Sequence, residues 1–162
     1  MALPKIEKAE AKLGSKLRIK FRSDGRWREV NLAGLIARYA GLDGLDDPEV
    51  FAKARVIDWG SAIGWPGDRD IAAATLLRLA EEQAAFSNAE FRIWQVTVKL
   101  SNNEAADALG CTVSTIKNYR SDRDIPTGVV IACRAMERDP AVLAAHLIPR
   151  KAGRPKNKST GH

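Results

Sequence analysis

The sequence is poor in the residues that build metal and disulfide sites. Its 162 residues include only two histidines and two cysteines, Cys111 and Cys133. No group of Cys and His has the spacing of a zinc site, so the sequence predicts neither a metal nor a cofactor. The count allows one disulfide. Free thiols that pack as small apolar side chains in a reducing compartment are the simpler interpretation.

Long apolar segments are lacking too. Apolar runs such as Val129–Cys133 are far shorter than the ~18 residues that a membrane span requires. The first 20 residues are charged throughout and lack the apolar segment of a signal peptide. We therefore expect a cytoplasmic, nucleoid-associated protein with no membrane partner.

Groupings typical of catalysis are also missing. The carboxylates Asp58, Asp68 and Asp70 lie near predicted turns, where acid–base chemistry is conceivable. No nucleophile–base pair, phosphate-binding loop or metal set accompanies them, and Asp70 is better explained as a helix cap. The sequence thus predicts no catalytic residue and no enzyme.

Charge is present but unevenly distributed. The chain carries a net charge of +6, of which residues 1–86 contribute +1, residues 87–149 contribute zero and residues 150–162 contribute +5. We expect residues 150–162 to form a basic disordered tail that contacts DNA phosphates through Arg154 and Lys156. Gly153–Lys156 is similar to the Gly-Arg-Pro core of minor-groove hooks. A plain basic tail that only adds solubility is the alternative.

The first half reads as α+β. Leu17–Phe21 and Trp27–Leu32 alternate apolar and polar residues around Asp24-Gly25, which predicts a β-hairpin. Further predicted elements are a helix over 33–39, a helix start at Asp47-Pro48, strands over 54–59 and 62–65, and a helix from Ile71 to about Ala85 that Asp70 caps. Trp59 and Trp65 flank the second pair of strands, and an exposed Trp there would indicate a partner surface.

Residues 5–79 resemble a small bacterial domain of unknown function. The matching features are Asp24-Gly25, Val30-Asn31-Leu32, Asp47-Pro48-Glu49-Val50-Phe51, and Trp65-Pro66 followed by Asp70-Ile71. The resemblance implies a curved antiparallel sheet with short helices and no known catalysis. It also implies an association with toxin–antitoxin-like gene pairs, and in some cases a fusion to a helix-turn-helix.

The second half reads as four to five helices. Ser87 with Glu90 and Ser101 with Glu104 have the spacing of capping boxes, and Gly110 follows the second helix as a left-handed cap. Thr112 starts the next helix. Pro126 and Asp139-Pro140 start two more, and Leu143 and Leu147 are expected to be buried. We predict an α+β domain over 1–85, a helix-turn-helix domain over 86–149 and the tail over 150–162.

The stretch from Ser101 to Arg120 has the requirements of two short helices that cross steeply. Ala106 supplies a small residue at the close approach, Gly110 the sharp exit, Cys111 an apolar plug, and Ile116 and Tyr119 inward contacts. The stretch resembles the Cro/repressor-type (XRE-like) helix-turn-helix family over residues 91–136. The matching positions are Leu100-Ser101, Glu104, Ala106, Leu109-Gly110, Thr112, Ser114-Thr115-Ile116 and Ile125-Pro126.

We expect the recognition helix to span 113–121 and to lie in the major groove of double-stranded DNA. The predicted base-contacting residues are Val113, Ser114, Thr115, Lys117 and Asn118. The predicted phosphate-contacting residues in this half are Asn102, Thr112, Arg120 and Arg123. Ala105 stands where the family has a larger aliphatic residue, and Asp122 and Asp124 place acids near the end of the helix.

Two functions remain open at this point. The protein is either a transcriptional regulator that binds DNA as a homodimer, or an antitoxin-like module that binds a protein encoded nearby and whose DNA binding is secondary. A helix-turn-helix that serves only as a packing unit is a further alternative, which the zero net charge of residues 87–149 favours. The outward Ser, Lys and Asn side chains and the basic tail favour DNA binding.

Overall fold

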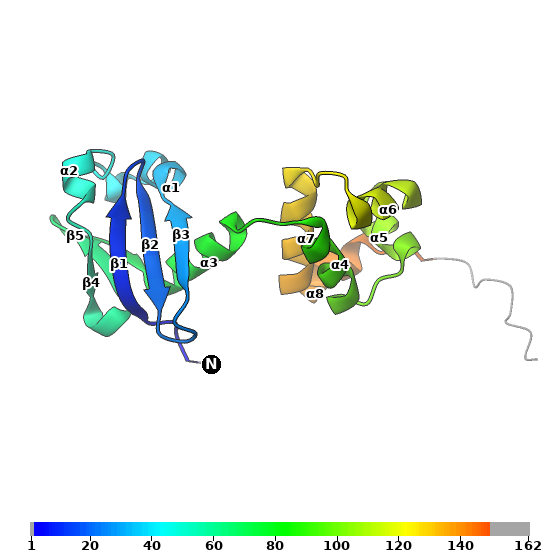
Figure 1. Cartoon of the computed structure of the whole chain (residues 1–162), viewed down its shortest axis with the longest axis horizontal. Helices are drawn as coiled ribbons and strands as arrows, with labels where there is room; N and C mark the ends of the chain where they lie inside the picture. The colour runs from blue at the N-terminus through cyan, green and yellow to red at the C-terminus, as the bar shows by residue number, and fades with distance from the viewer. Residues whose placement is uncertain (1, 150–162) are drawn as a thin grey trace, which may run out of the picture. The chain divides into compact units, whose positions relative to one another are not determined.

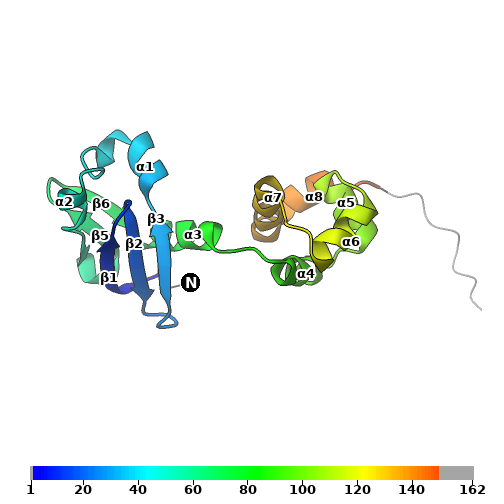
Figure 2. The same ribbon diagram turned by 45° about the horizontal axis from the view of Figure 1, so that its top comes forward.

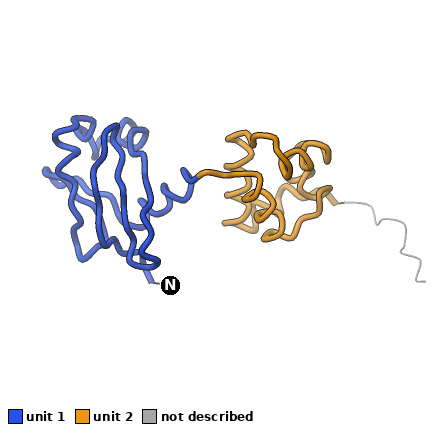
Figure 3. The backbone as a smooth tube through the Cα atoms, in the orientation of Figure 1, with its two compact units in different colours: residues 1–84 blue, residues 85–162 orange. Residues whose placement is uncertain are grey.

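The computed structural model describes residues 2–149 and divides the chain into two compact units. Unit 1 comprises residues 1–84 and unit 2 residues 85–162 (Figure 3). Each unit has its own apolar core: Leu17, Phe21 and Leu76 belong to the first, and Phe91 and Ile116 to the second. Within the described residues, no helix is both long and apolar enough to cross a membrane.

Among residues 2–149, unit 1 holds two three-stranded antiparallel sheets with the strand orders β1-β2-β3 and β4-β5-β6. The strands are β1 (Ile6–Lys12), β2 (Lys16–Phe21), β3 (Trp27–Asn31), β4 (Arg55–Ile57), β5 (Ala62–Trp65) and β6 (Arg69–Ala72). The helices are α1 (Ala33–Arg38), α2 (Pro48–Phe51) and α3 (Ala73–Gln83), with 3-10 turns at Ala40–Leu42 and Asp58–Gly60. The first sheet lies in front of β4 and β5 in Figure 1, and its buried side chains fill the space between the sheets.

Buried and solvent-exposed residues alternate along β2, the central strand of the first sheet. Leu17, Ile19 and Phe21 are fully buried, whereas the residues between them reach solvent. The predicted hairpin forms at Asp24-Gly25, where Gly25 has a φ of 63°. The Asp24 carboxylate accepts hydrogen bonds from the Arg28 guanidinium and the Arg26 amide, which lower the pKa of Asp24 to about 2.

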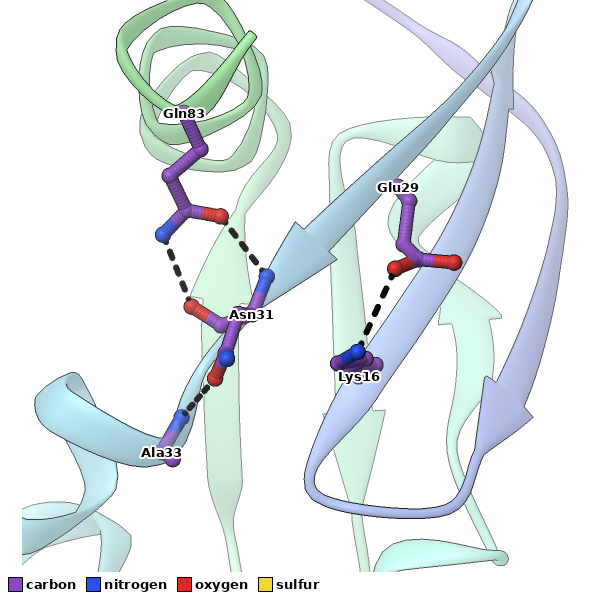
Figure 4. A network of polar contacts seen from close by, with 5 residues as sticks. All are labelled: Lys16, Glu29, Asn31, Ala33 and Gln83. Carbon is purple, nitrogen blue, oxygen red and sulfur yellow. Dashed lines mark hydrogen bonds and ion pairs between the residues drawn. The ribbon is translucent and has the colours of Figure 1, made fainter. Parts of the chain in front are cut away.

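Strand β3 is an edge strand that a glutamine covers in part. The side-chain amide of Gln83 donates to the Asn31 carbonyl oxygen at 2.9 Å and accepts from the Asn31 amide at 2.8 Å (Figure 4). The Asn31 side chain in turn accepts from the Ala33 amide at the start of α1. Gln83 thus takes the position of a neighbouring strand and fixes the end of α3 beside the sheet.

Two predictions for unit 1 are wrong, and one strand was missed. Asp70 is not a helix cap, because 69–72 pairs with β5 as strand β6 and the helix begins at Ala73. The strand expected over 54–59 ends at Ile57, because Asp58, Trp59 and Gly60 all have positive φ. Strand β1 was not predicted; its inward residues Ala9 and Ala11 are small, so its alternation is weak.

The expected exposure of one tryptophan is confirmed. Trp65 is buried and donates from Nε1 to the Phe51 carbonyl oxygen at 3.0 Å. Trp59 is 90% exposed on the left-handed turn. The same turn contains Gly60, where a Cβ would lie 2.5 Å from the Ile6 carbonyl oxygen.

All regular elements in the described part of unit 2 are helices. Together with the two sheets of unit 1, they confirm the predicted α+β class. The helices of unit 2 are α4 (Asn88–Thr97), α5 (Asn102–Leu109), α6 (Val113–Ser121), α7 (Thr127–Arg138) and α8 (Pro140–His146). Asp139 caps α8 by accepting from the Ala141 amide. The predicted burial of Leu143 and Leu147 is wrong, because Leu143 is half-buried and Leu147 is 37% exposed: α8 ends at His146, before Leu147 can turn inward.

Candidate nucleic-acid interface

A tight turn joins helices α5 and α6, at the position of the predicted helix-turn-helix. Gly110 ends α5 with φ 67° and ψ 34°, the left-handed conformation that a side chain disfavours. The next amide, that of Cys111, donates to the Ala106 carbonyl oxygen at 3.0 Å and so closes the turn. The two helices lie side by side in both Figure 1 and Figure 2.

Side chains cap the helices that form this motif. Ser87 and Ser101 each form the predicted capping box, with Glu90 and Glu104 respectively. At the start of α6, the Thr112 hydroxyl accepts from the Thr115 amide at 3.2 Å and contacts the Thr115 hydroxyl at 3.0 Å. The Thr112 side chain is therefore engaged within the helix, while its residue remains exposed beside the first turn of α6.

The inward face of α6 packs on aromatic side chains. Ile116 is fully buried and Tyr119 is 5% exposed. The Tyr119 ring meets the Phe91 ring edge-on, with centroids 5.6 Å apart. Ala105 and Ala106 are both buried beneath the turn, so the small residue at 105 belongs to the core.

The outward face of α6 presents three of the five residues predicted to contact bases. Ser114, Lys117 and Asn118 are exposed, with Lys117 and Asn118 one helical turn after Ser114, and Ser121 continues the same face one turn later. Val113 is half-buried against the core, and Thr115 is half-buried and bonded to Thr112. The exposed face thus offers hydroxyl, ammonium and amide groups along a single stripe.

Two side chains of α4 hold the end of α6. Asn88 donates from Nδ2 to the carbonyl oxygens of Tyr119 and Arg123, both at 2.8 Å. Arg92 donates to the Arg120 carbonyl oxygen at 2.6 Å. These bonds satisfy the free carbonyl groups at the C-terminus of α6 and fix its direction.

The buried side chain of Gln95 links Asn102 and Arg120, two residues predicted to contact DNA phosphates. Gln95 is 4% exposed, and its Nε2 donates to Asn102 Oδ1 at 2.9 Å and to the Leu100 carbonyl oxygen at 3.1 Å. Its Oε1 accepts from the Arg120 guanidinium at 2.7 Å. Gln95 therefore positions Asn102 at the start of α5 and Arg120 on α6. Sequence reasoning missed it, although a Gln four residues after Phe91 and three before Val98, on the apolar face of the predicted helix, is a signal.

The remaining residues predicted to contact phosphates are Arg123, Arg154 and Lys156. Arg123 is exposed, and its guanidinium lies 5.7 Å from the centroid of the Tyr119 ring. The exposed acids Asp122 and Asp124 flank it, as the sequence indicated. Arg154 and Lys156 lie outside the described residues.

Both cysteines are free thiols. Cys133 is fully buried, and desolvation raises the pKa of its thiol to about 12. Cys111 is half-buried in the turn, and burial raises its pKa as well. The thiols pack as apolar groups, which agrees with the simpler of the two interpretations of the sequence.

Comparisons with known proteins bear mainly on unit 1. Residues 6–82, just under half of the chain, match the model of a family described as a protein of unknown function (DUF2442). This confirms the predicted domain of unknown function in the first half. The match does not extend to the helix-turn-helix, whose resemblance to the Cro/repressor family stays a prediction.

A solved structure from Nitrosomonas europaea ATCC 19718, named "Putative DNA Binding Protein NE0471", is 28% identical to this chain. The alignment covers 91% of this chain and 94% of that chain, with a TM-score of 0.48. No curated protein matches the chain.

Proposed function

We propose that unit 2 binds double-stranded DNA with α6 in the major groove, and that the protein is a sequence-specific transcriptional regulator without catalytic activity. The observation that carries the proposal is the exposed stripe of Ser114, Lys117 and Asn118 on a helix whose opposite face is anchored by Ile116 and Tyr119. Lys donates to guanine, Asn pairs with adenine through two hydrogen bonds, and Ser contacts either base.

The anchoring of α6 supports this proposal over a role in packing alone. Asn88, Arg92 and Gln95 together make hydrogen bonds that fix α6 from α4. A rigid helix loses little freedom when it enters a groove, so its side chains keep their register with the base edges. In this proposal Asn102 and Arg120 contact phosphates on either side, with Gln95 setting their positions.

One recognition helix contacts few base pairs, so the proposal includes a homodimer on two half-sites about one helical turn apart. Sedimentation equilibrium at micromolar concentration, with and without duplex, tests this part. A dimer in either condition agrees with it, and a monomer in both contradicts it.

Substitutions on α6 test the reading of bases. Lys117→Gln and Asn118→Ala are expected to reduce the preference for a duplex from the gene's own upstream region over a scrambled duplex, each by about 1–3 kcal/mol. Lys99→Gln removes the same charge as Lys117→Gln from an exposed position outside α6 and leaves the preference unchanged. Equal effects of Lys99→Gln and Lys117→Gln would contradict the assignment of α6.

A second function is supported by Trp59, whose indole is 90% exposed on a conformationally strained turn. Exposed Trp side chains are typical anchors of protein interfaces. In this alternative, unit 1 is an antitoxin-like module that binds a protein encoded nearby. Trp59→Ala would then abolish complex formation with the co-expressed neighbour and spare DNA binding, whereas an unchanged complex would count against the alternative.

A further inference from the structure

Unit 1 is nearly neutral as a whole but strongly polarised. Residues 5–29, which form the first sheet and its turns, carry nine basic and four acidic side chains. Residues 38–82 carry five basic and nine acidic side chains. The net charges are +5 and −4, so the positive charge of the unit is concentrated on the sheet β1-β2-β3.

The strand register brings these cations to one face. Across β1 and β2, Lys8 lies opposite Lys20 and Lys12 lies opposite Lys16, with Arg18 between them on β2. Because Leu17, Ile19 and Phe21 point into the core, the alternate residues of β2 point to solvent. The outward face contains Lys8, Glu10, Lys12, Lys16, Arg18, Lys20, Trp27, Glu29 and Asn31. Figure 1 looks onto this face.

Acidic neighbours neutralise the face only in part. Glu10 is shared between Lys12 at 3.3 Å and Arg18 at 3.9 Å, and Glu29 lies 3.7 Å from Lys16 (Figure 4). These pairs are exposed and long, so each contributes little and opens readily. Glu7, at the register shift of β1, lies 3.4 Å from Lys20, so five cations stand against three acids and the net charge of this face is +2.

We propose that the outward face of β1-β2-β3 is a second DNA-binding surface that contacts the phosphate backbone without reading sequence. Lys16, Arg18 and Lys20 repeat every second residue along β2, about 6.6–6.8 Å apart, which suits a polymer with regularly spaced negative charges. Residues 87–149 have no net charge, so a positive surface on unit 1 would add to the phosphate contacts of α6. The inference rests on the proposed function only for the choice of duplex DNA as the ligand.

The aromatic residue on this face favours duplex over single-stranded nucleic acid. The Arg18 guanidinium lies over the Trp27 ring, 4.6 Å from its centroid. The guanidinium therefore covers one face of the half-buried indole, which leaves less of the ring to stack on an unpaired base. The cations remain available to the phosphates of either strand of a duplex.

A matched pair of triple variants of the full chain tests the inference. Lys8→Gln, Lys12→Gln and Lys20→Gln remove three charges from the face. Lys53→Gln, Arg55→Gln and Arg78→Gln remove three from exposed positions of the same unit outside that face. In fluorescence anisotropy, the first triple is expected to weaken binding to native and scrambled duplexes alike by about tenfold or more, and to reduce the salt slope by about 2 to 3. The second triple is expected to change both by less than about a third as much.

A variant that removes negative charge from the face controls for loss of DNA binding through misfolding. Glu10→Gln together with Glu29→Gln removes two of the three acids that pair with the cations of the face, so binding to both duplexes is expected to tighten severalfold. Damaged protein would not bind more tightly. Equal losses for the two triple variants would assign the effect to net charge and overturn the inference. Unchanged binding in the first triple would also overturn it, and would leave an acidic protein as the partner of this face.

The outcome separates this inference from the proposed function. If wild-type protein does not distinguish the two duplexes but the first triple still weakens both, α6 reads no sequence and the face binds phosphates. If wild type prefers the native duplex and the first triple binds as wild type does, the regulator stands and the inference is wrong.

Discussion

The two units use their polar residues in opposite ways. In unit 2, Asn88, Arg92 and Gln95 direct their polar groups at α6 and fix the helix that carries the exposed stripe. In unit 1, the lysines of β1 and β2 and Arg18 face outward, and the core beneath is wholly apolar. In the two proposals, unit 2 holds its base-contacting helix in a fixed position, whereas unit 1 presents charge to phosphates, for which exact position matters less.

The largest test of this contrast concerns the independence of the two cores. Ile116→Ala removes a fully buried side chain from unit 2 and is expected to destabilise it by about 2–5 kcal/mol. Ile19→Ala makes the matching change in unit 1. Thermal unfolding should show two transitions, each moved by one variant only. A single transition moved by both would mean that the units fold as one.

Alkaline pH should weaken unit 2 selectively. The buried Cys133 thiol has its pKa raised to about 12 from an ordinary value of 9.0, so the folded state keeps a proton that the unfolded chain releases. The stabilisation is complete below about pH 9 and is lost as pH rises towards about 12, by at most ~1.4 kcal/mol per pH unit. Urea unfolding between pH 8 and 10 measures the decline, which Cys133→Ala should reduce. An equal decline in Cys133→Ala would contradict the thiol as the cause.

Substitution of Gln95 tests whether its buried hydrogen bonds contribute to DNA binding. Gln95→Ala leaves the Leu100 carbonyl and the Asn102 and Arg120 side chains without their partner, at an expected cost of about 1–3 kcal/mol in stability. Binding to native and scrambled duplexes should fall together, because the phosphate contacts lose their positions. Unchanged DNA binding at a temperature where the variant is folded would restrict Gln95 to a structural role.

The smallest expected effects come from the two left-handed residues that flank α5. A Cβ at Gly110 meets nothing within 4 Å, so Gly110→Ala costs only backbone strain, about 1 kcal/mol. Lys99 has a φ of 58° at the end of α4, and Lys99→Gly should stabilise unit 2 by ~0.5–1 kcal/mol. Chemical denaturation measures both, and a stabilising Gly110→Ala would contradict the conformational argument.

Local signals sufficed for much of unit 2. The Ser101 capping box, Gly110 and Thr112 each act within three or four residues, and α6 begins and ends where the sequence predicts. In unit 1, long-range pairing overrides local preference. Ile71 pairs with Ile63 in a sheet, which converts the predicted start of α3 into strand β6. The outward stripe of α6 follows from periodicity, but the link from Gln95 to Arg120 spans 25 residues and has no local signal.

The central claim is that α6 reads sequence, and one titration tests it most directly. Wild-type protein is titrated by fluorescence anisotropy against a duplex from its own upstream region and a scrambled duplex, over a series of salt concentrations. We predict tighter binding to the native duplex that persists at ~150 mM salt, where purely electrostatic binding has largely decayed. Equal binding to both duplexes that disappears at that salt concentration would contradict the claim and leave only the charged surfaces in contact with DNA.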